Sequence, residues 1–192
     1  MRRIAITGGI AAGKTTVSNV FKENGAYVVD ADVIVHELLS PDTAVGKQVV
    51  GLLGKEIVVK GKIDRKKIAH LVFSNPKKLS SLEAILHPAV KQEIENHYKK
   101  VKDRTNSTFF VVEVPLLYEA KMEAMFDTVI AVIADPSIAK SRFSLGEKEY
   151  ELRTKRQEKD RLKAQKADFT IVNDGDIASL KKATLKIIKE LQ

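Results

Sequence analysis

A glycine-rich segment near the start of the chain constrains the fold more than any other feature. Residues 8–16 read Gly-Gly-Ile-Ala-Ala-Gly-Lys-Thr-Thr, so that one glycine is followed, after four residues, by Gly-Lys-Thr. The apolar run 3–7 precedes this segment and predicts a buried strand. Val17, Val20 and Phe21 follow it at helical spacing. A strand, a glycine-rich turn and a helix in this order form a phosphate-binding loop, so we predict that the chain binds a nucleoside triphosphate.

The residues of this loop have distinct expected tasks. The glycines let the backbone curl so that successive N–H groups point at a phosphate, and the helix N-terminus adds a partial positive charge. Lys14 is expected to reach the β- and γ-phosphates, while the hydroxyl of Thr15 is expected to hold Mg²⁺. The residues expected to bind the nucleotide are Gly8, Gly9, Ala11, Ala12, Gly13, Lys14, Thr15 and Thr16.

Length and composition narrow the class of protein. A chain of 192 residues, 44% of them hydrophobic, allows one domain with its own core. No run of about 18 apolar residues occurs, and the chain enters its first strand at once, so we expect neither a membrane span nor a signal peptide. Cysteine is absent, which excludes disulfides and thiolate metal sites and fits a cytoplasmic protein.

The formal charge of +8 has three interpretations. It fits nucleic-acid binding, a pocket for polyanionic small molecules, or a lysine-rich surface that faces water. The aromatic residues are sparse and are not interleaved with the basic ones, as base stacking would require. We therefore expect no nucleic acid and no membrane among the partners, and the oligomeric state stays open.

Five short apolar segments predict the strands of a sheet. None of them alternates cleanly, so both faces of the sheet are expected to be covered. Helical stretches separate them, which favours crossover connections and a parallel sheet. The last helix is expected to begin near Asp176. The five segments are 3–7, 26–29, 109–114, 128–133 and 169–172.

Two regions do not fit this simple alternation. Between the second and third strands no strong strand signal occurs, and we expect a helical insertion, because the connection is far longer than a crossover needs. Its loosest part is expected at 54–62, and its helices at about 31–39, 44–53, 64–73 and 76–101. The segment 142–166 is rich in basic residues and has few core-forming ones, so we expect it to be mobile.

Acidic residues follow several of the predicted strands, at the end where ligands bind in open α/β sheets. After the second strand, Asp32 is the candidate base for an attacking hydroxyl, while Asp30 is expected to cap a helix or to support the site. Glu113 ends the third strand and is a candidate to help hold Mg²⁺ through water. Asp135, which precedes Pro136, is expected to cap the next helix instead.

Arg142, Arg153 and Arg156 are candidates for closing on the transferred phosphate. Phosphoryl transfer needs cations around the γ-phosphate, and the planar guanidinium pairs two phosphate oxygens at once. An ordinary exposed helix would carry the same arginines, so this alternative stays open. His87 precedes Pro88 within a helical pattern, and a lone histidine is more often structural than functional.

Taken together, the residues resemble the dephospho-coenzyme A kinase family over nearly the whole chain. The resemblance begins with the phosphate loop, which many kinases share. It is far more specific in the Asp-Ala-Asp, His-Pro and Pro-Leu-Leu-Tyr-Glu segments. The matching segments beyond the loop are Val29-Asp30-Ala31-Asp32, Ile63-Asp64-Arg65, Val72-Phe73, Leu82-Glu83, Leu86-His87-Pro88-Ala89-Val90, Val114-Pro115-Leu116-Leu117-Tyr118-Glu119, Arg153 with Gln157, Ala167-Asp168-Phe169 and Asn173-Asp174-Gly175.

This resemblance implies an α/β fold: a P-loop kinase-like three-layer sandwich with a five-stranded parallel sheet, a helical substrate-binding insertion and a short lid. A single kinase domain would comprise a nucleotide-binding core over 1–35 and 105–192, an acceptor-binding insertion over 36–104 and a lid over 140–166. The implied reaction is ATP-dependent phosphorylation of the ribose 3′-hydroxyl of dephospho-coenzyme A. Its partners would be ATP and dephospho-coenzyme A, and its cofactor Mg²⁺.

The resemblance also implies roles for particular residues. Asn173 would lie near the adenine of ATP and joins the nucleotide-binding residues. The expected catalytic residues are Asp32 as the base, Lys14, Arg142 and Arg153. The expected acceptor-binding residues are Asp32, Arg65, His87, Pro115, Leu116 and Leu117.

Three departures from the family pattern matter. Ala11-Ala12 stands where Gly-Ser is common, and Ala11 restricts the backbone more than glycine does. His36 stands where an arginine is usual, so a charge there depends on pH. The segment between Arg142 and Arg153 is short and lacks one expected arginine.

Two other functions remain open. The nearer is another P-loop kinase that acts on a nucleotide or a metabolite. The more distant is a non-catalytic nucleotide-binding protein acting on RNA, although no Asn-Lys-x-Asp guanine signature occurs.

Overall fold

The computed structural model describes the chain except for residues 74, 105, 145 and 155–158. The described residues form two compact units, one of Met1–Asp30 with Tyr98–Gln192 and one of Ala31–His97. The division into a core, an insertion over 36–104 and a lid over 140–166 stays a prediction. Among the described helices, none is both long and apolar enough to cross a membrane.

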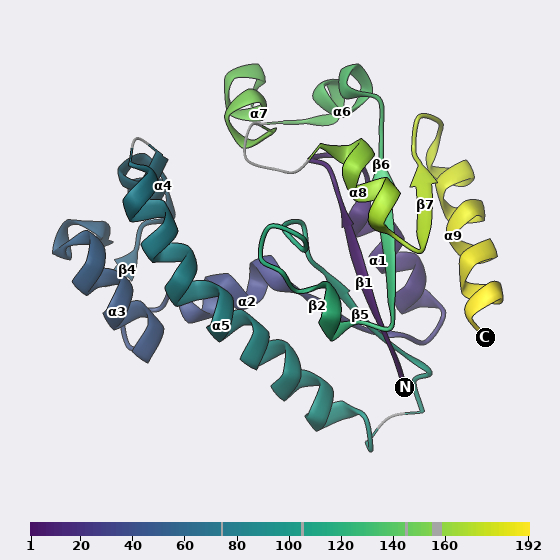
Figure 1. The fold of residues 1–192 in the computed structure, drawn as a ribbon, viewed down its shortest axis with the longest axis horizontal. Helices are drawn as coiled ribbons and strands as arrows, with labels where there is room; N and C mark the ends of the chain where they lie inside the picture. Colours follow the sequence, from purple (N-terminus) through teal and green to yellow (C-terminus); the bar gives the residue numbers. More distant parts are fainter. Residues whose placement is uncertain (74, 105, 145, 155–158) are drawn as a thin grey trace. The chain divides into compact units, whose positions relative to one another are not determined.

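The first unit is built on a five-stranded sheet in which all strands run parallel (Figure 1). The strand order is β2-β5-β1-β6-β7, and the fold class and strand positions predicted from the apolar segments are confirmed. In the register, Glu113 lies opposite both Ile6 and Asp30, so the carboxyl ends of three strands meet there. The strands are β1 (Arg2–Gly8), β2 (Tyr27–Asp30), β5 (Phe109–Glu113), β6 (Thr128–Ile133) and β7 (Phe169–Val172).

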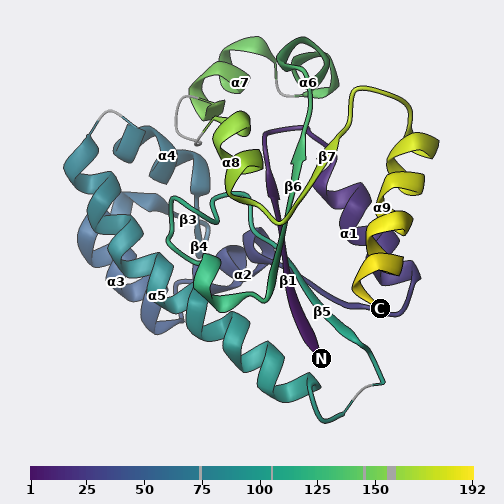
Figure 2. The same ribbon diagram turned by 45° about the vertical axis from the view of Figure 1, so that its right-hand side comes forward.

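Helices cover both faces of this sheet. Figure 2 shows α1 (Lys14–Glu23) and α9 (Ile177–Leu191) on one side and α8 (Asp160–Lys166) on the other. Phe21 of α1 meets Phe109 of β5 edge to face, with ring centroids 6.0 Å apart, inside the buried core. α9 begins after Asp176, as predicted, and the Asp176 side chain accepts a hydrogen bond from Ser179 N.

The segment between β6 and β7 contains α6 (Pro136–Arg142), α7 (Glu147–Thr154) and α8. The segment is expected to be mobile because it has few core-forming residues, but α8 packs against the sheet. This helix packs against β1 and β6, and its Lys163 side chain is 0% exposed. The prediction of a core helix depends on apolar residues at its buried positions. α8 has Lys163 at such a position, so its hydrophobic pattern did not indicate that the helix packs against the core.

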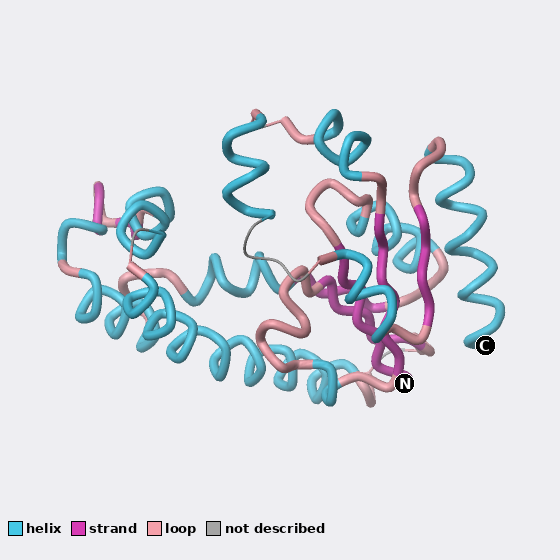
Figure 3. Tube along the Cα trace, turned by 45° about the horizontal axis from the view of Figure 1, so that its top comes forward, coloured by secondary structure: helices cyan, strands magenta, loops and turns pink. Residues whose placement is uncertain are grey.

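In its described residues, the second unit contains helices and one short hairpin (Figure 3). The hairpin falls in and next to the 54–62 stretch, in a region where the sequence contains no strong strand signal. Val58 pairs with Ile63 in an antiparallel ladder of two-residue strands, which are too short to give a sequence pattern. Ile57 and Ile63 are buried in the core of this unit. The elements are α2 (Ala31–Leu38), α3 (Ala44–Leu53), the 3₁₀-helix η1 (Lys55–Ile57), β3 (Val58–Val59), β4 (Lys62–Ile63), α4 (Arg65–Phe73) and α5 (Pro76–Val101), which continues into the first unit.

Candidate active site

The phosphate loop connects β1 to α1, and two of its glycines are required by the surrounding atoms. Gly8 has a φ of 140°, and a Cβ there would overlap the carbonyl oxygen of Val132. Gly13 has a φ of 103°, and a Cβ there would press on the side-chain amide of Asn173. Both residues therefore combine a left-handed backbone with a close approach that only glycine allows.

Ala11 also has a left-handed backbone, with a φ of 54°. This conformation is unfavourable for a residue with a Cβ, so the loop carries strain at this position. The neighbouring Ala12 is fully buried.

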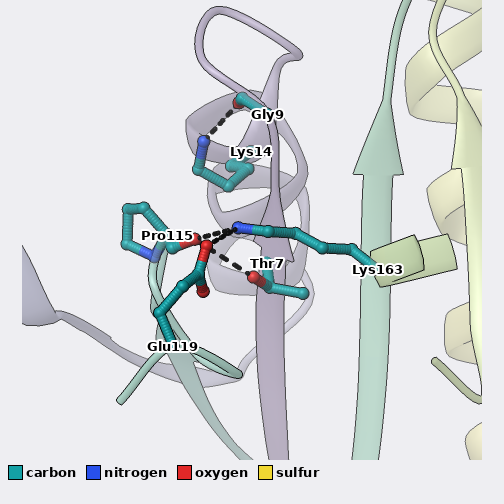
Figure 4. A network of polar contacts seen from close by, with 6 residues as sticks. All are labelled: Thr7, Gly9, Lys14, Pro115, Glu119 and Lys163. Atoms are coloured by element: carbon teal, nitrogen blue, oxygen red, sulfur yellow. Dashed lines mark hydrogen bonds and ion pairs between the residues drawn. The ribbon is translucent and has the colours of Figure 1, made fainter. Parts of the chain in front are cut away.

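Lys14 begins α1 and turns back into the loop. Its side chain is 8% exposed, and its ammonium donates a hydrogen bond of 2.7 Å to the carbonyl oxygen of Gly9 (Figure 4). The positive charge is therefore held within the loop, where backbone N–H groups and the helix N-terminus also favour an anion.

Glu113, at the end of β5, contacts two hydroxyls of α1. Thr15 Oγ1 donates to Glu113 Oε1 and Ser18 Oγ donates to Oε2, each over 3.1 Å. Burial raises the pKa of the Glu113 carboxyl, while the Lys14 charge and the Ser18 hydroxyl act to lower it and Asp30 acts to raise it. The sequence did not predict that Ser18 contacts Glu113, because a serine within a helix has no pattern that distinguishes it from other helical residues.

Thr15 and Glu113 present the oxygen ligands that Mg²⁺ prefers. Among the described residues, no group of three or more histidine, cysteine, aspartate or glutamate side chains could hold a metal by itself. A magnesium ion that is bound by one or two protein oxygens, water and substrate phosphates does not need such a group. The donors present therefore fit this ion.

Asn173, directly after β7, contacts the phosphate loop, and Arg142 holds the backbone around Asn173. The Asn173 side-chain amide donates to the carbonyl oxygen of Ala12 over 2.8 Å. The Arg142 guanidinium, at the end of α6, donates to the carbonyl oxygens of Asn173 over 2.8 Å and of Gly175 over 2.9 Å. Asn173, the residue expected near the adenine, thus contacts the phosphate loop, and Arg142 holds the backbone at Asn173 and Gly175.

The 115–119 segment follows β5 and contacts α8. Lys163 Nζ donates to the carbonyl oxygen of Pro115 over 2.6 Å and lies 3.0 Å from Glu119 Oε1 (Figure 4). The hydroxyl of Thr7 donates to the same Pro115 carbonyl over 3.4 Å. Leu117 is fully buried, whereas Leu116 is 39% exposed. The sequence offered no signal for Lys163, which is one of several basic residues in its segment.

The matches to known proteins include the residues of the phosphate loop and of the 115–119 segment. A family model described as dephospho-CoA kinase matches residues 2–179, which include the phosphate loop, Glu113 and the 115–119 segment. The chain belongs to the dephospho-CoA kinase family. Dephospho-CoA kinase of Protochlamydia amoebophila is 45% identical over 197 residues, which cover 100% of this chain and 97% of that protein. The Chlamydia trachomatis serovar D enzyme is 37% identical over 194 residues, 99% of this chain and 96% of that protein.

Solved structures agree with this assignment. Dephospho-CoA kinase from Campylobacter jejuni matches with a TM-score of 0.71 and 25% identity, covering 98% of this chain and 96% of that one. A shikimate kinase from Aquifex aeolicus matches with a TM-score of 0.54 at 13% identity, over 98% of this chain and 96% of that one, and this likeness shows the fold alone. The chain is a phosphotransferase with an alcohol group as acceptor, and it phosphorylates dephospho-CoA with ATP.

Three residues expected at the acceptor of a dephospho-CoA kinase belong to the second unit. Asp32 lies in the first turn of α2 and Arg65 begins α4, and both side chains are exposed. His87 lies within α5 next to Pro88 and is half-buried. Burial lowers the pKa of His87, with Glu83 raising it and Lys91 lowering it further.

The remaining candidates have different outcomes. Asp135 caps α6, since its side chain accepts from Ser137 N, so the prediction of a cap is confirmed. Arg153 belongs to α7, but its side chain lies outside the described part of the structure. Arg156 and Gln157 also lie outside the described residues.

Proposed function

We propose that this dephospho-CoA kinase transfers the γ-phosphate of ATP to the ribose 3′-hydroxyl through the residues described above. For the part of the site that would bind ATP, the best supporting observation is the Thr15–Glu113 hydrogen bond of 3.1 Å beside the buried Lys14. Lys14 would neutralise oxygens of the β- and γ-phosphates, and backbone N–H groups of the loop would hold them. Catalysis would then consist mostly of positioning and electrostatic stabilisation.

Mg²⁺ would be held by Thr15 directly and by Glu113 through water. The bound ion would neutralise charge on the phosphate oxygens. Glu113 supports this site in a second way, because its hydrogen bonds fix the hydroxyls of Thr15 and Ser18.

Asp32 is the proposed general base. It would accept the proton of the ribose 3′-hydroxyl while the 3′-oxygen bonds to the γ-phosphorus and the bond from that phosphorus to the β–γ bridging oxygen breaks, so that ADP leaves. Arg65, His87 and the residues Pro115, Leu116 and Leu117 would bind the acceptor. Leu116 supports this view, because it exposes a large apolar side chain beside the buried Leu117.

Arg142 and Arg153 are the proposed cations for the transferred phosphate. Arg142 lies next to the loop of Asn173 and Gly175. Its hydrogen bonds to these two carbonyl oxygens use two of the five N–H donors of the guanidinium. Arg153 is proposed from the family resemblance alone. We further propose that the enzyme works in the cytoplasm, in keeping with its lack of cysteine, and that its charge of +8 serves its polyanionic substrates.

ADP release, measured with and without dephospho-CoA, tests this proposal. We expect release to depend on dephospho-CoA, and the Asp32→Asn variant to lose turnover by on the order of a hundredfold or more while it still binds ATP. Near-normal turnover in Asp32→Asn would remove this residue from the role of base. ADP release that depends equally on another nucleoside or metabolite would favour a kinase of different specificity. Salt-sensitive RNA binding without acceptor-dependent release would favour the non-catalytic alternative.

A further inference from the structure

Among the described residues near the phosphate loop, Lys163 is the most deeply buried ionisable side chain. It is 0% exposed, compared with 8% for Lys14. Taking an ammonium out of water is unfavourable unless nearby groups compensate for the lost hydration. We therefore expect the buried ammonium of Lys163 to make contacts that an apolar side chain at this position could not make.

The partners of Lys163 are the two ends of one short segment. Its ammonium contacts the carbonyl oxygen of Pro115 at 2.6 Å and the carboxylate of Glu119 at 3.0 Å (Figure 4). Both contacts are charge-assisted, and together they hold 115–119 as a closed turn against α8. Lys166, on the next turn of α8, lies with its Nζ 5.0 Å from the ring centroid of Tyr118 and holds the same segment a second time.

The same helix also contacts the phosphate loop. Asp160 is in the first turn of α8, three residues before Lys163, and a Cβ added at Gly9 would overlap its carboxylate. The charges of Lys163 and Lys14 both act on this carboxylate. One helix of seven residues thus contacts the donor loop through Asp160 and the 115–119 segment through Lys163.

We propose that Lys163 is a positioning residue for the acceptor, because its buried ammonium holds both ends of 115–119 and thereby sets where Leu116 and Leu117 lie. The inference rests on the proposed role of Pro115, Leu116 and Leu117 in acceptor binding. Lys163 itself contacts Pro115 and Glu119, so it acts through this segment. α8 then belongs to the acceptor site as well as to the lid.

Steady-state kinetics of the full chain test this role. Lys163→Met keeps an unbranched side chain that is one atom shorter and removes its donors, so we expect the KM for dephospho-CoA to rise about tenfold. The KM for ATP and kcat should each change less than about threefold, because the phosphate loop keeps its own contacts. Lys159→Met, which removes an equal charge from an exposed position at the start of α8, is the matched control and should leave all three constants unchanged.

Glu119→Gln gives a second measurement that general loss of packing would not mimic. It keeps the shape of the side chain and weakens the same contact, so it should raise the same KM to a smaller extent. The double variant Lys163→Met/Glu119→Gln should raise it by less than the product of the single effects, because the two residues share one interaction. Independent effects, or a Lys163→Met variant with a lower melting temperature and unchanged KM, would overturn the proposal.

Leu116→Ala separates this inference from the proposed acceptor site. If Leu116→Ala raises the KM for dephospho-CoA and Lys163→Met does not, the positioning role is wrong while the acceptor site stands. If Leu116→Ala leaves that KM unchanged, the assignment of the acceptor site to this segment is wrong, and the positioning role is lost with it. A rise in both variants, with Lys159→Met unchanged, supports both.

Discussion

At the scale of single residues, Ala11 is where the phosphate loop conflicts with its own backbone. The sequence marked both Ala11 and Ala12 as departures from the family pattern. Only Ala11 has a left-handed φ, at 54°, whereas Ala12 is buried. The strain therefore lies at one of the two positions, and substitution by glycine should affect them in opposite directions.

We expect Ala11→Gly to raise the free energy of unfolding by about 0.5–1 kcal/mol, because the relief of left-handed strain exceeds the entropy gained by the unfolded chain. Urea denaturation measures this change. Ala12→Gly is the matched control and should lower the stability, since it removes a buried methyl group. Equal losses in both variants would show that Ala11 carries no strain.

Glu113 provides a prediction about pH. Burial raises its pKa above the ordinary 4.5, so the native state holds the proton more tightly than the unfolded state does. Its contribution to the free energy of unfolding is therefore largest at low pH and declines as the pH rises from about the ordinary value through the raised one. We expect Glu113→Gln to remove this decline and, at neutral pH without nucleotide, to be at least as stable as the parent.

The same Glu113→Gln variant should lose activity by about 10- to 100-fold, because the support of the magnesium site is weakened. Denaturation curves at several pH values and turnover at saturating Mg²⁺ measure the two effects. Glu37→Gln, an exposed change of the same charge, should alter neither. A Glu113→Gln variant that keeps the parental dependence of stability on pH would contradict this interpretation.

At the scale of elements, the strands of the parallel sheet and the long helices could be predicted closely, and the packing of the segment between β6 and β7 could not. β5 is buried at every position, and its unbroken apolar run identifies it without tertiary information. α8 carries Lys163 where a core helix would carry an apolar residue, so its packing was invisible in the pattern. The β3–β4 hairpin was missed because two-residue strands give no periodicity.

Arg142 also connects two elements, because it links the end of α6 to the loop of Asn173 and Gly175 that follows β7. Arg142 reaches two carbonyl groups with two different nitrogens of one planar guanidinium, and the shorter lysine, with its single ammonium, does not reproduce this fork geometry. We expect Arg142→Lys to raise the KM for ATP about tenfold, since the loop that includes Asn173 loses two charge-assisted hydrogen bonds. A parallel fall in kcat would follow from the proposed contact with the transferred phosphate.

Initial rates over a range of ATP concentrations distinguish these effects of Arg142→Lys. Ser141→Ala, an exposed change at the neighbouring position of α6, is the control and should keep the parental constants. An unchanged KM for ATP, together with a lower kcat, would show that the two carbonyl bonds do not matter for nucleotide binding.

At the scale of the whole molecule, the phosphate loop and the proposed general base belong to different units of the chain. Lys14 lies in the unit of Met1–Asp30 with Tyr98–Gln192, and Asp32 lies in the unit of Ala31–His97. Binding of ATP and turnover should therefore be separable by substitution. ATP with Mg²⁺ at about 100 times its dissociation constant should stabilise the protein by about 2.7 kcal/mol.

We expect Lys14→Ala to lose most of the stabilisation by ATP and most of the turnover. Asp32→Asn should still be stabilised by ATP and should lose only turnover. Thermal unfolding with and without ATP and Mg²⁺, followed by turnover assays, measures both quantities. Lys22→Ala, on the exposed end of α1, should behave like the parent. A Lys14→Ala variant stabilised as strongly as the parent would remove the ammonium from nucleotide binding.

The sequence by itself determined the phosphate loop, the parallel sheet and the family, because glycine spacing, apolar runs and short specific segments are local properties of the chain. Tertiary structure alone decided that Ser18 and Thr15 share Glu113, that Asn173 holds Ala12, and that Lys163 joins Pro115 to Glu119. These contacts connect residues far apart in the chain, so no local pattern encodes them. Whether a polar side chain is buried depends on which elements pack over it, and that is settled only when the chain has folded.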